Sequence, residues 1–135
     1  MKRRLPTFLF ENLNKIVPYV SCDVLLVNKR GEFLLTWRED RRWKGWHIPG
    51  SIVDEGEEFD DTIYRVMVSE LGISTYSLGF LFPTSQTESK RGHNISLLWE
   101  ARSGEAPRDG KWFSEIPRNI IEYHGEMIRR YLNER

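Results

Sequence analysis

The sequence predicts an α/β fold in which a mixed β-sheet lies between helices. Segments with strand character occur both before and after a central helical segment, and a second long helical segment ends the chain. This alternation is typical of a sheet whose faces are covered by helices. The 135 residues are 39% hydrophobic and 13% aromatic, which suits one hydrophobic core. We therefore expect a single domain over residues 1–135.

The first part of the chain is expected to form a short helix and then a β-hairpin. Apolar residues recur at helical spacing in residues 5–16, where Pro6 suits the first turn. Two apolar segments, 21–28 and 32–38, flank Gly31 and predict two paired antiparallel strands. A charged loop follows, and residues 46–48 form a short strand.

The central helix is expected to begin near Glu57 and to end at Gly72. Several carboxylates occupy its first turns and oppose the positive end of the helix dipole, while glycine readily adopts the positive φ that ends a helix. At about 100° per residue, one face is apolar, and Asp61 and Arg65 form an ion pair on the opposite face. The predicted apolar face contains Phe59, Ile63, Val66, Met67 and Leu71.

Glu70 falls on this apolar face. A carboxylate among apolar side chains needs hydrogen bonds, a basic partner or a metal ion. The residue types alone leave two interpretations open: a glutamate at the helix end that reaches solvent or a basic strand residue, or a functional ligand.

The rest of the chain predicts strands and a final helix. Strands are expected at 77–82, 93–102 and 111–113, with the polar segment SQTESKRG as the turn between the first two, and a helix at 120–132.

Residues 50–73 resemble the Nudix box, the loop–helix signature of a large hydrolase family. The box requires a glycine, five residues, a glutamate, seven residues and then a helical motif rich in glutamate. Ser51, preceded by Gly50, occupies the first glycine position, and Val66 and Ser69 stand at two glutamate positions. The positions in register are Glu57, Arg65, Met67, Glu70, Gly72 and Ile73.

This resemblance implies a Nudix-type α/β/α sandwich with a mixed β-sheet. Glu57, Arg65 and Gly72 would hold the box together. Positions 66, 69 and 70 are expected on one helix side, where the full box binds cations through carboxylates. Only Glu70 remains there, so the resemblance implies one Mg²⁺, or Mn²⁺ instead, on Glu70 and the Gly50 carbonyl. The pattern RVMVSELG is most similar to the GDP-mannose mannosyl hydrolases, which also lack these glutamates.

Asp23 and Arg38 lie in the two strands of the predicted hairpin. One interpretation is a structural salt bridge at the sheet edge. The segment SCDVLLVNKRGEFLLTWR is also similar to a segment of the mannosyl hydrolases that supplies an aspartate and an arginine to the departing diphosphate and the sugar. Because a guanidinium contacts phosphate oxygens at two points, the resemblance implies catalytic roles for Asp23, Arg38 and Glu70 and substrate binding by Arg38.

Trp43 and Trp46 flank the predicted loop mouth, and His93 begins a strand. These three are candidates for substrate binding, although packing is the commoner role for tryptophan. No histidine is spaced with another histidine or cysteine for a zinc site, and His124 is expected at the surface or in packing. In the mannosyl hydrolases the general base is a histidine before a tryptophan. The matching stretch, SGEAPRDGKWF, contains only Glu105 and Asp109 as acids.

Composition argues against several classes of partner. Lys and Arg total 20, as do Asp and Glu, so no net charge favours nucleic acid or a membrane surface. No apolar run reaches the length of a membrane span. One cysteine, Cys22, permits no internal disulfide, which indicates a reducing cytoplasm.

The leading hypothesis is a Mg²⁺-dependent Nudix hydrolase that acts on a nucleoside diphosphate linked to another group. A nucleotide sugar like GDP-mannose is the preferred substrate class. The alternative is a non-catalytic Nudix-like module that binds a nucleotide or a protein. Homodimers are common in the resembling subgroup, so the N-terminal helix is expected to pack on its own sheet or on a second subunit.

Overall fold

The computed structural model describes residues 6–90 and 92–135. Leu5, within the predicted N-terminal helix, lies outside the described residues. The helical elements are α1 (Thr7–Leu13), α2 (Phe59–Tyr64), the π-helix η1 (Arg65–Glu70) and α3 (Glu122–Glu134). The strands are β1 (Tyr19–Leu26), β2 (Phe33–Glu39), β3 (Lys44–His47), β4 (Gly50–Ile52), β5 (Ser77–Ser89), β6 (Gly92–Arg102) and β7 (Lys111–Phe113).

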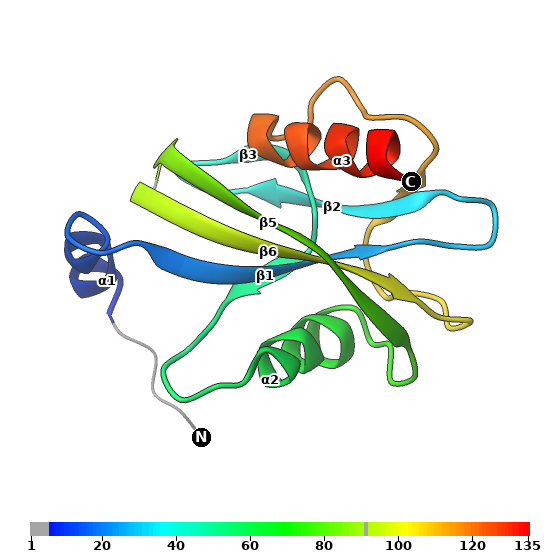
Figure 1. Cartoon of the computed structure of the whole chain (residues 1–135), viewed down its shortest axis with the longest axis horizontal. Coiled ribbons are helices and arrows are strands. Elements are labelled where there is room, and N and C mark those ends of the chain that lie inside the picture. Colours follow the sequence, from blue (N-terminus) through cyan, green and yellow to red (C-terminus); the bar gives the residue numbers. More distant parts are fainter. Residues whose placement is uncertain (1–5, 91) are drawn as a thin grey trace.

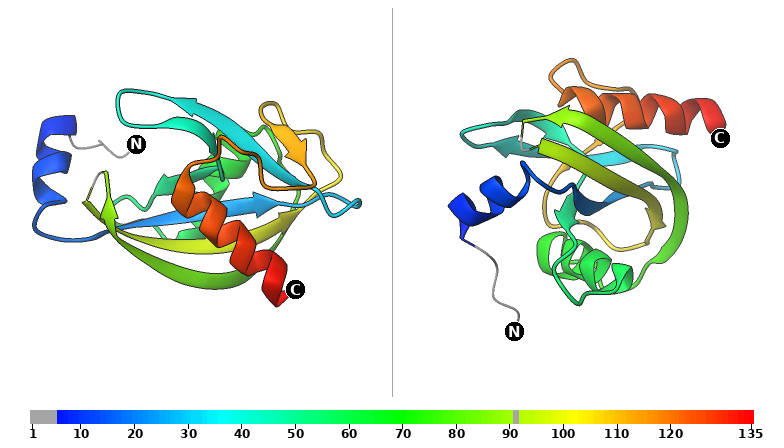
Figure 2. Two further views of the ribbon diagram at one scale, coloured as in Figure 1. Left: turned by 90° about the horizontal axis from the view of Figure 1, so that it is seen from above. Right: turned by 60° about the vertical axis from the view of Figure 1, so that its left-hand side comes forward.

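The strands form two sheets that pack between helices. One sheet has the order β4-β1-β6-β5 and the other β3-β2-β7. β1 pairs parallel to β6 and antiparallel to β4, so the larger sheet is mixed. Figure 1 shows α2 on one side of the strands and α3 on the other, and Figure 2 shows both helices from two further directions. The predicted α/β fold with a mixed sheet is confirmed.

Strand β1 lies at the centre of the core because both of its faces are covered. Cys22 and Val24 pack in a cluster with Val66 and Met67 of η1. On the other face of the strand, Leu25 packs in a second cluster that includes Met127 and Ile128 of α3. A strand buried on both faces has an almost continuous apolar sequence, which explains the segment VLLV.

The predicted hairpin forms only at its turn. Asn28 and Glu32 exchange hydrogen bonds at the turn, and Val27 and Phe33 form one isolated bridge. Beyond this point β1 and β2 enter different sheets. β1 has β4 and β6 on its two edges, so no edge remains for β2. The expectation that Asp23 and Arg38 lie on paired strands is therefore wrong.

Strands β5 and β6 are longer than the sequence predicts. The segment SQTES, expected in a turn, continues β5 to Ser89, where it pairs with β6. The register of this ladder shifts between Phe80 and Phe82 and again between Gln86 and Ser89. Pairing with a long neighbouring strand thus extends β structure into a segment whose composition favours a turn.

The second half of the box helix is a π-helix. The Leu71 N–H donates to the Val66 carbonyl at 3.1 Å, a bond between residues five apart. Val66 is fully buried, whereas Ser69 and Glu70 are exposed. The three positions, which the sequence places on one helix side, therefore differ in environment. Phe59, expected on the apolar face, is 46% exposed.

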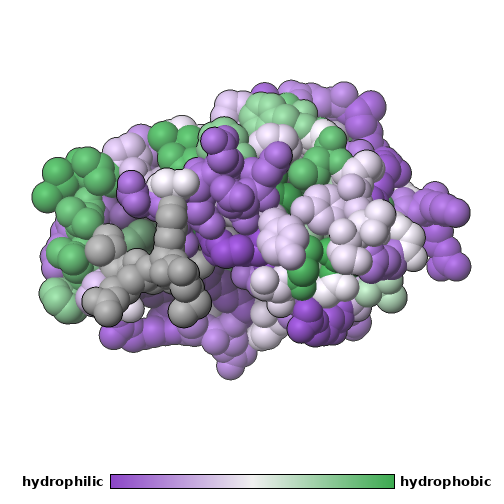
Figure 3. All heavy atoms as spheres, turned by 90° about the horizontal axis from the view of Figure 1, so that it is seen from below, coloured by the Kyte–Doolittle hydropathy of each residue, from purple (hydrophilic) through white to green (hydrophobic). Residues whose placement is uncertain are grey.

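Helix α1 lies at one end of the sheets, where the ring of Phe10 is 5.8 Å from that of Tyr19 in β1. It contributes no buried residue, and Figures 1 and 2 place it beyond the end of β1, away from α2 and α3. Phe8 is 70% and Ile16 79% exposed. Figure 3 shows the resulting group of hydrophobic side chains at this end of the molecule. Across residues 6–90 and 92–135, no helix has the length and apolar character needed to cross a membrane.

The different environments of Val66 and Ser69 lead to a stability prediction. Val66→Glu would place an unpaired charge among apolar side chains, and we expect the free energy of unfolding to fall by about 3–5 kcal/mol. Ser69→Glu is the matched control, and because that position is exposed we expect a change within about 0.5 kcal/mol. Urea denaturation of both variants measures this. Equal effects of the two substitutions would contradict the burial of Val66.

Candidate active site

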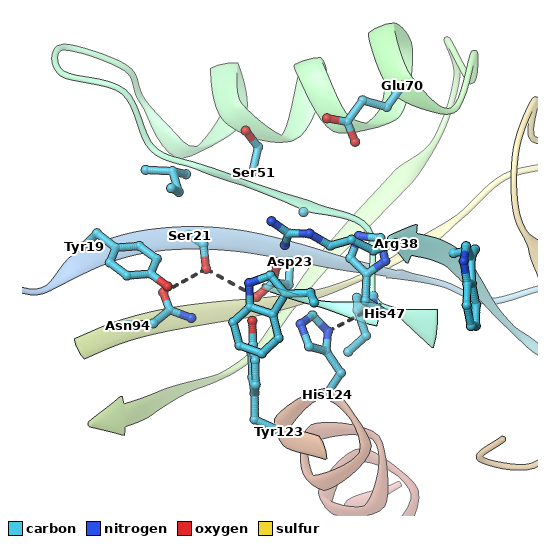
Figure 4. A pocket seen from close by; sticks show the side chains of 15 residues that line it. Tyr19, Ser21, Asp23, Arg38, His47, Ser51, Glu70, Asn94, Tyr123 and His124 are labelled. Atoms are coloured by element: carbon cyan, nitrogen blue, oxygen red, sulfur yellow. Dashed lines mark hydrogen bonds between the residues drawn. The ribbon is translucent and has the colours of Figure 1, made fainter. Parts of the chain in front are cut away.

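One cavity of about 400 Å³ collects most of the sequence-predicted site residues. Figure 4 shows Glu70 and Ser51 on one side of it and Tyr123 and His124 of α3 on the other, with Arg38 drawn between them. The residues that line the cavity are Tyr19, Ser21, Asp23, Trp37, Arg38, Trp43, His47, Ile48, Gly50, Ser51, Ile52, Glu70, Asn94, Tyr123 and His124.

Asp23 is a buried carboxylate that lines this cavity. It is 6% exposed, and its Oδ2 accepts hydrogen bonds from the hydroxyls of Ser96 and, at 3.4 Å, Ser21. Burial raises the pKa of Asp23 to about 6, while the two hydroxyl donors and the charge of Arg38 oppose this rise. The site thus holds a carboxylate that is costly to bury and is stabilised by hydroxyl donors.

Arg38 pairs with Asp40 rather than with Asp23. Its Nε donates to Asp40 Oδ2 at 2.8 Å, and among the described residues no ion pair joins Arg38 to Asp23. The predicted alternative of a structural Asp23–Arg38 salt bridge is therefore wrong. Arg38 still lines the cavity, and its charge lowers the pKa of Asp23 from a distance.

Gly50 lies directly beside Asp23 in the antiparallel β1–β4 pairing. A Cβ atom at Gly50 would lie 1.9 Å from Asp23 Oδ1 and 2.8 Å from the Cys22 carbonyl oxygen. The absence of a side chain at position 50 therefore allows the Asp23 carboxylate to occupy this space. Gly50 and Glu70, the two predicted metal ligands, line the same cavity.

The loop between β4 and α2 is fastened to the helix by Glu57 and Arg65. Arg65 Nε donates to Glu57 Oε2 at 2.9 Å and Nη2 to Oε1 at 2.7 Å. The same guanidinium donates to Ser51 Oγ at 2.8 Å and to the Ile52 carbonyl at 2.9 Å. Thr62 donates a further hydrogen bond to Glu57 at 3.1 Å. These contacts hold β4, the loop and the helix together, as predicted for Glu57 and Arg65.

The predicted Asp61–Arg65 ion pair does not form. Asp61 instead accepts a hydrogen bond from the Glu58 backbone N–H at 2.9 Å, in a capping box at the start of α2. Gly72 ends the helix with φ 69°, as the sequence predicts.

Two histidines to which the sequence assigns no role, His47 and His124, line the cavity. His124 is 3% exposed, so of its two predicted placements, at the surface or in packing, the structure has the second, and its Nδ1 accepts the Ile48 backbone N–H at 2.9 Å. His47 Nδ1 lies 2.8 Å from the Thr36 carbonyl oxygen. Burial lowers the pKa of both imidazoles, that of His124 strongly.

The three substrate-binding candidates from the sequence are placed differently. Trp43 lines the cavity, is 7% exposed and packs edge-on against Tyr123. Trp46 packs against Trp37 and Phe113 in the second core cluster and is not a lining residue. His93 bonds to Ser85 through Nε2 and also lies outside the lining.

The acids of the stretch SGEAPRDGKWF do not line the cavity. Glu105 accepts hydrogen bonds from the backbone N–H groups of Ser74 and Thr75 at 3.0 and 2.6 Å. Asp109 bonds to the N–H of Gly110. Glu105 thus caps a turn after the box helix.

Sequence reasoning missed the polar residues that surround Asp23. The parallel pairing places Ser21 opposite Ser96, and Asn94 lies two residues earlier on the same strand. Ser21 Oγ lies 3.3 Å from Asn94 Oδ1, so Asn94 is a second possible acceptor for the hydroxyl that faces Asp23. Polar residues that alternate within two otherwise apolar strands were the available signal, because a period of two places them on one face.

The fold and the box belong to a known family. The NUDIX domain model matches residues 18–126, which is most of the chain. The chain therefore belongs to the Nudix hydrolase family, and the predicted enzyme class is confirmed.

Similar proteins include curated relatives and many solved structures. The low-salt glycan biosynthesis protein Agl8 of Haloferax volcanii is 38% identical over 71 residues, which are 52% of this chain and 45% of Agl8. The chain thus spans about half of the length of this relative. MutT NUDIX hydrolase from Burkholderia pseudomallei has a TM-score of 0.74 at 21% identity, over 84% of this chain and 97% of that one. The NUDIX domain of Shewanella oneidensis NrtR, complexed with ADP ribose, has a TM-score of 0.70 at 17% identity, over 87% and 88%.

Protonation of Glu57 should release the loop from the helix. Its hydrogen bonds from Arg65 are the main cause that lowers the Glu57 pKa from 4.5 to about 2. Because the folded-state pKa is lowered, the stabilisation is present above about pH 4.5 and is lost as the pH falls towards 2. The difference in unfolding free energy between the wild type and Glu57→Gln should shrink over this interval. A pH-independent difference in denaturant titrations would contradict this assignment.

Two glycine substitutions test the close approach of Gly50 to Asp23. Gly50→Ala should displace the Asp23 carboxylate and lower the unfolding free energy by about 1–3 kcal/mol. The control is Gly79→Ala in β5, because a Cβ there meets no atom within 4 Å and should change stability by no more than about 0.5 kcal/mol. Thermal melts of the two variants measure the difference. Similar melting temperatures would show that Gly50 is not needed for this packing.

Proposed function

We propose that this chain is a Mg²⁺-dependent hydrolase of a nucleoside diphosphate linked to a second group, with a nucleotide sugar as the preferred substrate class. The observation that carries the proposal is the convergence of Arg38, Asp23, Gly50 and Glu70 on one cavity that an aromatic residue, Trp43, also lines. A guanidinium suits the diphosphate, and an indole face suits a base or sugar.

The names of two similar proteins support the substrate class. Agl8 is described as a glycan biosynthesis protein, a process that is compatible with a nucleotide sugar. The NrtR domain was solved with ADP ribose, in which a diphosphate joins a nucleoside to a second sugar. The subgroup resemblance of the segment RVMVSELG adds GDP-mannose as the first substrate to test.

The donor set is compatible with one cation that the substrate helps to bind. Glu70 supplies a carboxylate, and Gly50 offers a backbone carbonyl in the same cavity. Val66 is fully buried in the core, and the described residues contain no group of three His, Cys, Asp or Glu side chains able to hold a metal. When bound, Mg²⁺ or Mn²⁺ would neutralise diphosphate charge together with water and substrate oxygens.

The protein side chains would then divide the remaining tasks. Arg38 would bind the departing diphosphate, where its positive charge stabilises the negative charge that accumulates as the bond breaks. Asp23, held by Ser21 and Ser96, would orient the reacting sugar from the cavity wall. Trp43 would pack against the substrate and exclude water. Trp46 and His93 have no part in this arrangement because they do not line the cavity.

A non-catalytic binding module is the second candidate, and one observation favours it. The burial of Val66 shows that the standard box carboxylate at this position has been replaced by core packing. Such a protein would bind the nucleotide in the same cavity without turnover. The predicted homodimer stays a prediction, for which the exposed apolar side chains of α1 are the relevant surface.

An activity panel with a metal-site variant tests the proposal. Wild-type protein with Mg²⁺ should release reducing sugar or phosphate from at least one nucleotide sugar. Glu70→Gln should abolish most of this activity, because the amide lacks the charge that binds Mg²⁺, and should retain the wild-type melting temperature. Product analysis in H₂¹⁸O identifies the cleaved bond, since the label enters the sugar after C–O cleavage and a phosphate after P–O cleavage.

The outcomes separate the two candidates. Nucleotide binding by calorimetry without turnover of any substrate would support the binding module. Full activity in Glu70→Gln, or a Mg²⁺ binding isotherm identical to that of the wild type, would remove Glu70 from the site.

A further inference from the structure

The hydrogen bond of His47 determines which of its ring nitrogens carries the proton. Nδ1 lies 2.8 Å from the carbonyl oxygen of Thr36, the residue opposite His47 in the β2–β3 ladder. The Thr36 hydroxyl lies 3.3 Å from the same nitrogen and can donate or accept. The carbonyl contact is shorter, and a carbonyl oxygen can only accept a hydrogen bond, so this contact assigns the proton to Nδ1. In the neutral ring Nε2 therefore has a lone pair. Among residues 6–90 and 92–135, none donates a hydrogen bond to Nε2.

His124 has the opposite tautomer. Its Nδ1 accepts the Ile48 backbone N–H, which can only donate, so the neutral ring carries its proton on Nε2. The two rings are 5.8 Å apart and nearly perpendicular, and both residues line the cavity. One wall of the cavity therefore offers an imidazole acceptor on His47 and an imidazole donor on His124.

The reaction proposed above needs a group that accepts a proton from water. Glu105 bonds to the backbone of Ser74 and Thr75, and neither Glu105 nor Asp109 lines the cavity. Asp23 accepts two hydroxyl hydrogen bonds on Oδ2. His124 in its neutral form already carries a proton on Nε2. His47 differs from these groups because its Nε2 is unprotonated in the neutral ring and can accept a proton.

We propose that His47 is the general base of this enzyme, that Thr36 is its positioning residue, and that His124 donates a hydrogen bond to the substrate. This inference rests on the proposed function. Water attacks the electrophilic carbon or phosphorus while its O–H proton moves to His47 Nε2. The bond to the leaving phosphate breaks, and the leaving group takes the electron pair beside Arg38. The resulting imidazolium then returns the proton to solvent.

The surroundings of His47 keep this nitrogen in its neutral form. Burial is the main cause that lowers the His47 pKa, and the charge of Arg38 on β2 acts in the same direction. The Thr36 carbonyl and the charges of Asp40 and Asp109 oppose the shift. The ring of His124 on α3 lies 5.8 Å away, and the Asp23 and Glu70 carboxylates line the same cavity. A base must be unprotonated, so activity should fall as the pH drops through a value below 6.5, the ordinary pKa of histidine.

The tautomers can be measured without any substrate. Long-range ¹H–¹⁵N correlation spectra of the full-length protein at pH 7.5 distinguish protonation at Nδ1 from protonation at Nε2. We expect the Nδ1–H form for His47 and the Nε2–H form for His124. His47→Asn and His124→Asn spectra assign the signals. An Nε2–H signal from His47 would overturn the proposal whatever the activity of the enzyme.

The kinetic test replaces the base while keeping its contact. His47→Asn retains a side-chain donor for the Thr36 carbonyl but has no basic nitrogen. We expect kcat to fall about 10²–10⁴-fold with little change in KM, and the acidic limb of the pH profile to shift, because only Asp23, with a pKa of about 6, then titrates there. His93→Asn is the matched control, because His93 lies outside the cavity, and it should retain wild-type kinetics.

A third variant distinguishes the loss of a base from the loss of the fold. Imidazole added to His47→Gly should restore part of the lost activity, which a merely structural histidine would not explain. An active wild type whose kcat and acidic limb persist in His47→Asn would refute the assignment of His47 and leave the proposed function intact. A wild type that hydrolyses no nucleotide derivative would instead refute the proposed function.

Discussion

The candidate site depends on the ion pair between Glu57 and Arg65. The guanidinium makes two charge-assisted hydrogen bonds to the carboxylate and further bonds to Ser51 and Ile52 of β4. Charge-assisted bonds of this kind are stronger than neutral ones, and a planar guanidinium can hold several partners in fixed directions. One side chain thereby joins an edge strand, a loop and a helix. This connection adds to the β1–β4 pairing and to the packing of η1 on β1, which also position Gly50 and Glu70.

Burial of Asp23 is the main energetic cost of this cavity. The carboxylate lies almost out of contact with water, and its raised pKa records the desolvation. Ser96 and Ser21 offset part of the cost, and Gly50 leaves the space that the carboxylate occupies. An aspartate in such a position does not improve packing, which is the usual mark of a residue kept for binding or chemistry.

The altered box has a structural explanation at one of its two changed positions. Val66 is part of the apolar cluster between η1 and β1, so its replacement of a glutamate adds core packing. Ser69 is exposed and shows no such gain. Glu70, the last residue of η1, lines the same cavity as Gly50. A site with fewer protein carboxylates relies more on substrate oxygens to bind a cation.

The sequence by itself determined the order and type of most elements and the family, because periodicity, turn residues and the spacing of the box are local properties. It also identified Asp23, Arg38, Gly50 and Glu70 as candidates. The tertiary structure decided that Arg65 pairs with Glu57 and not with Asp61. Only the tertiary structure decided which strand pairs with β1, and that choice brings Asn94 and Ser96 to Asp23. It also decided that Arg38 pairs with Asp40, and that the imidazoles of His47 and His124 face one cavity from β3 and α3. These contacts are made by backbone and side-chain groups whose directions depend on packing between distant segments, and no local pattern of residues encodes those directions.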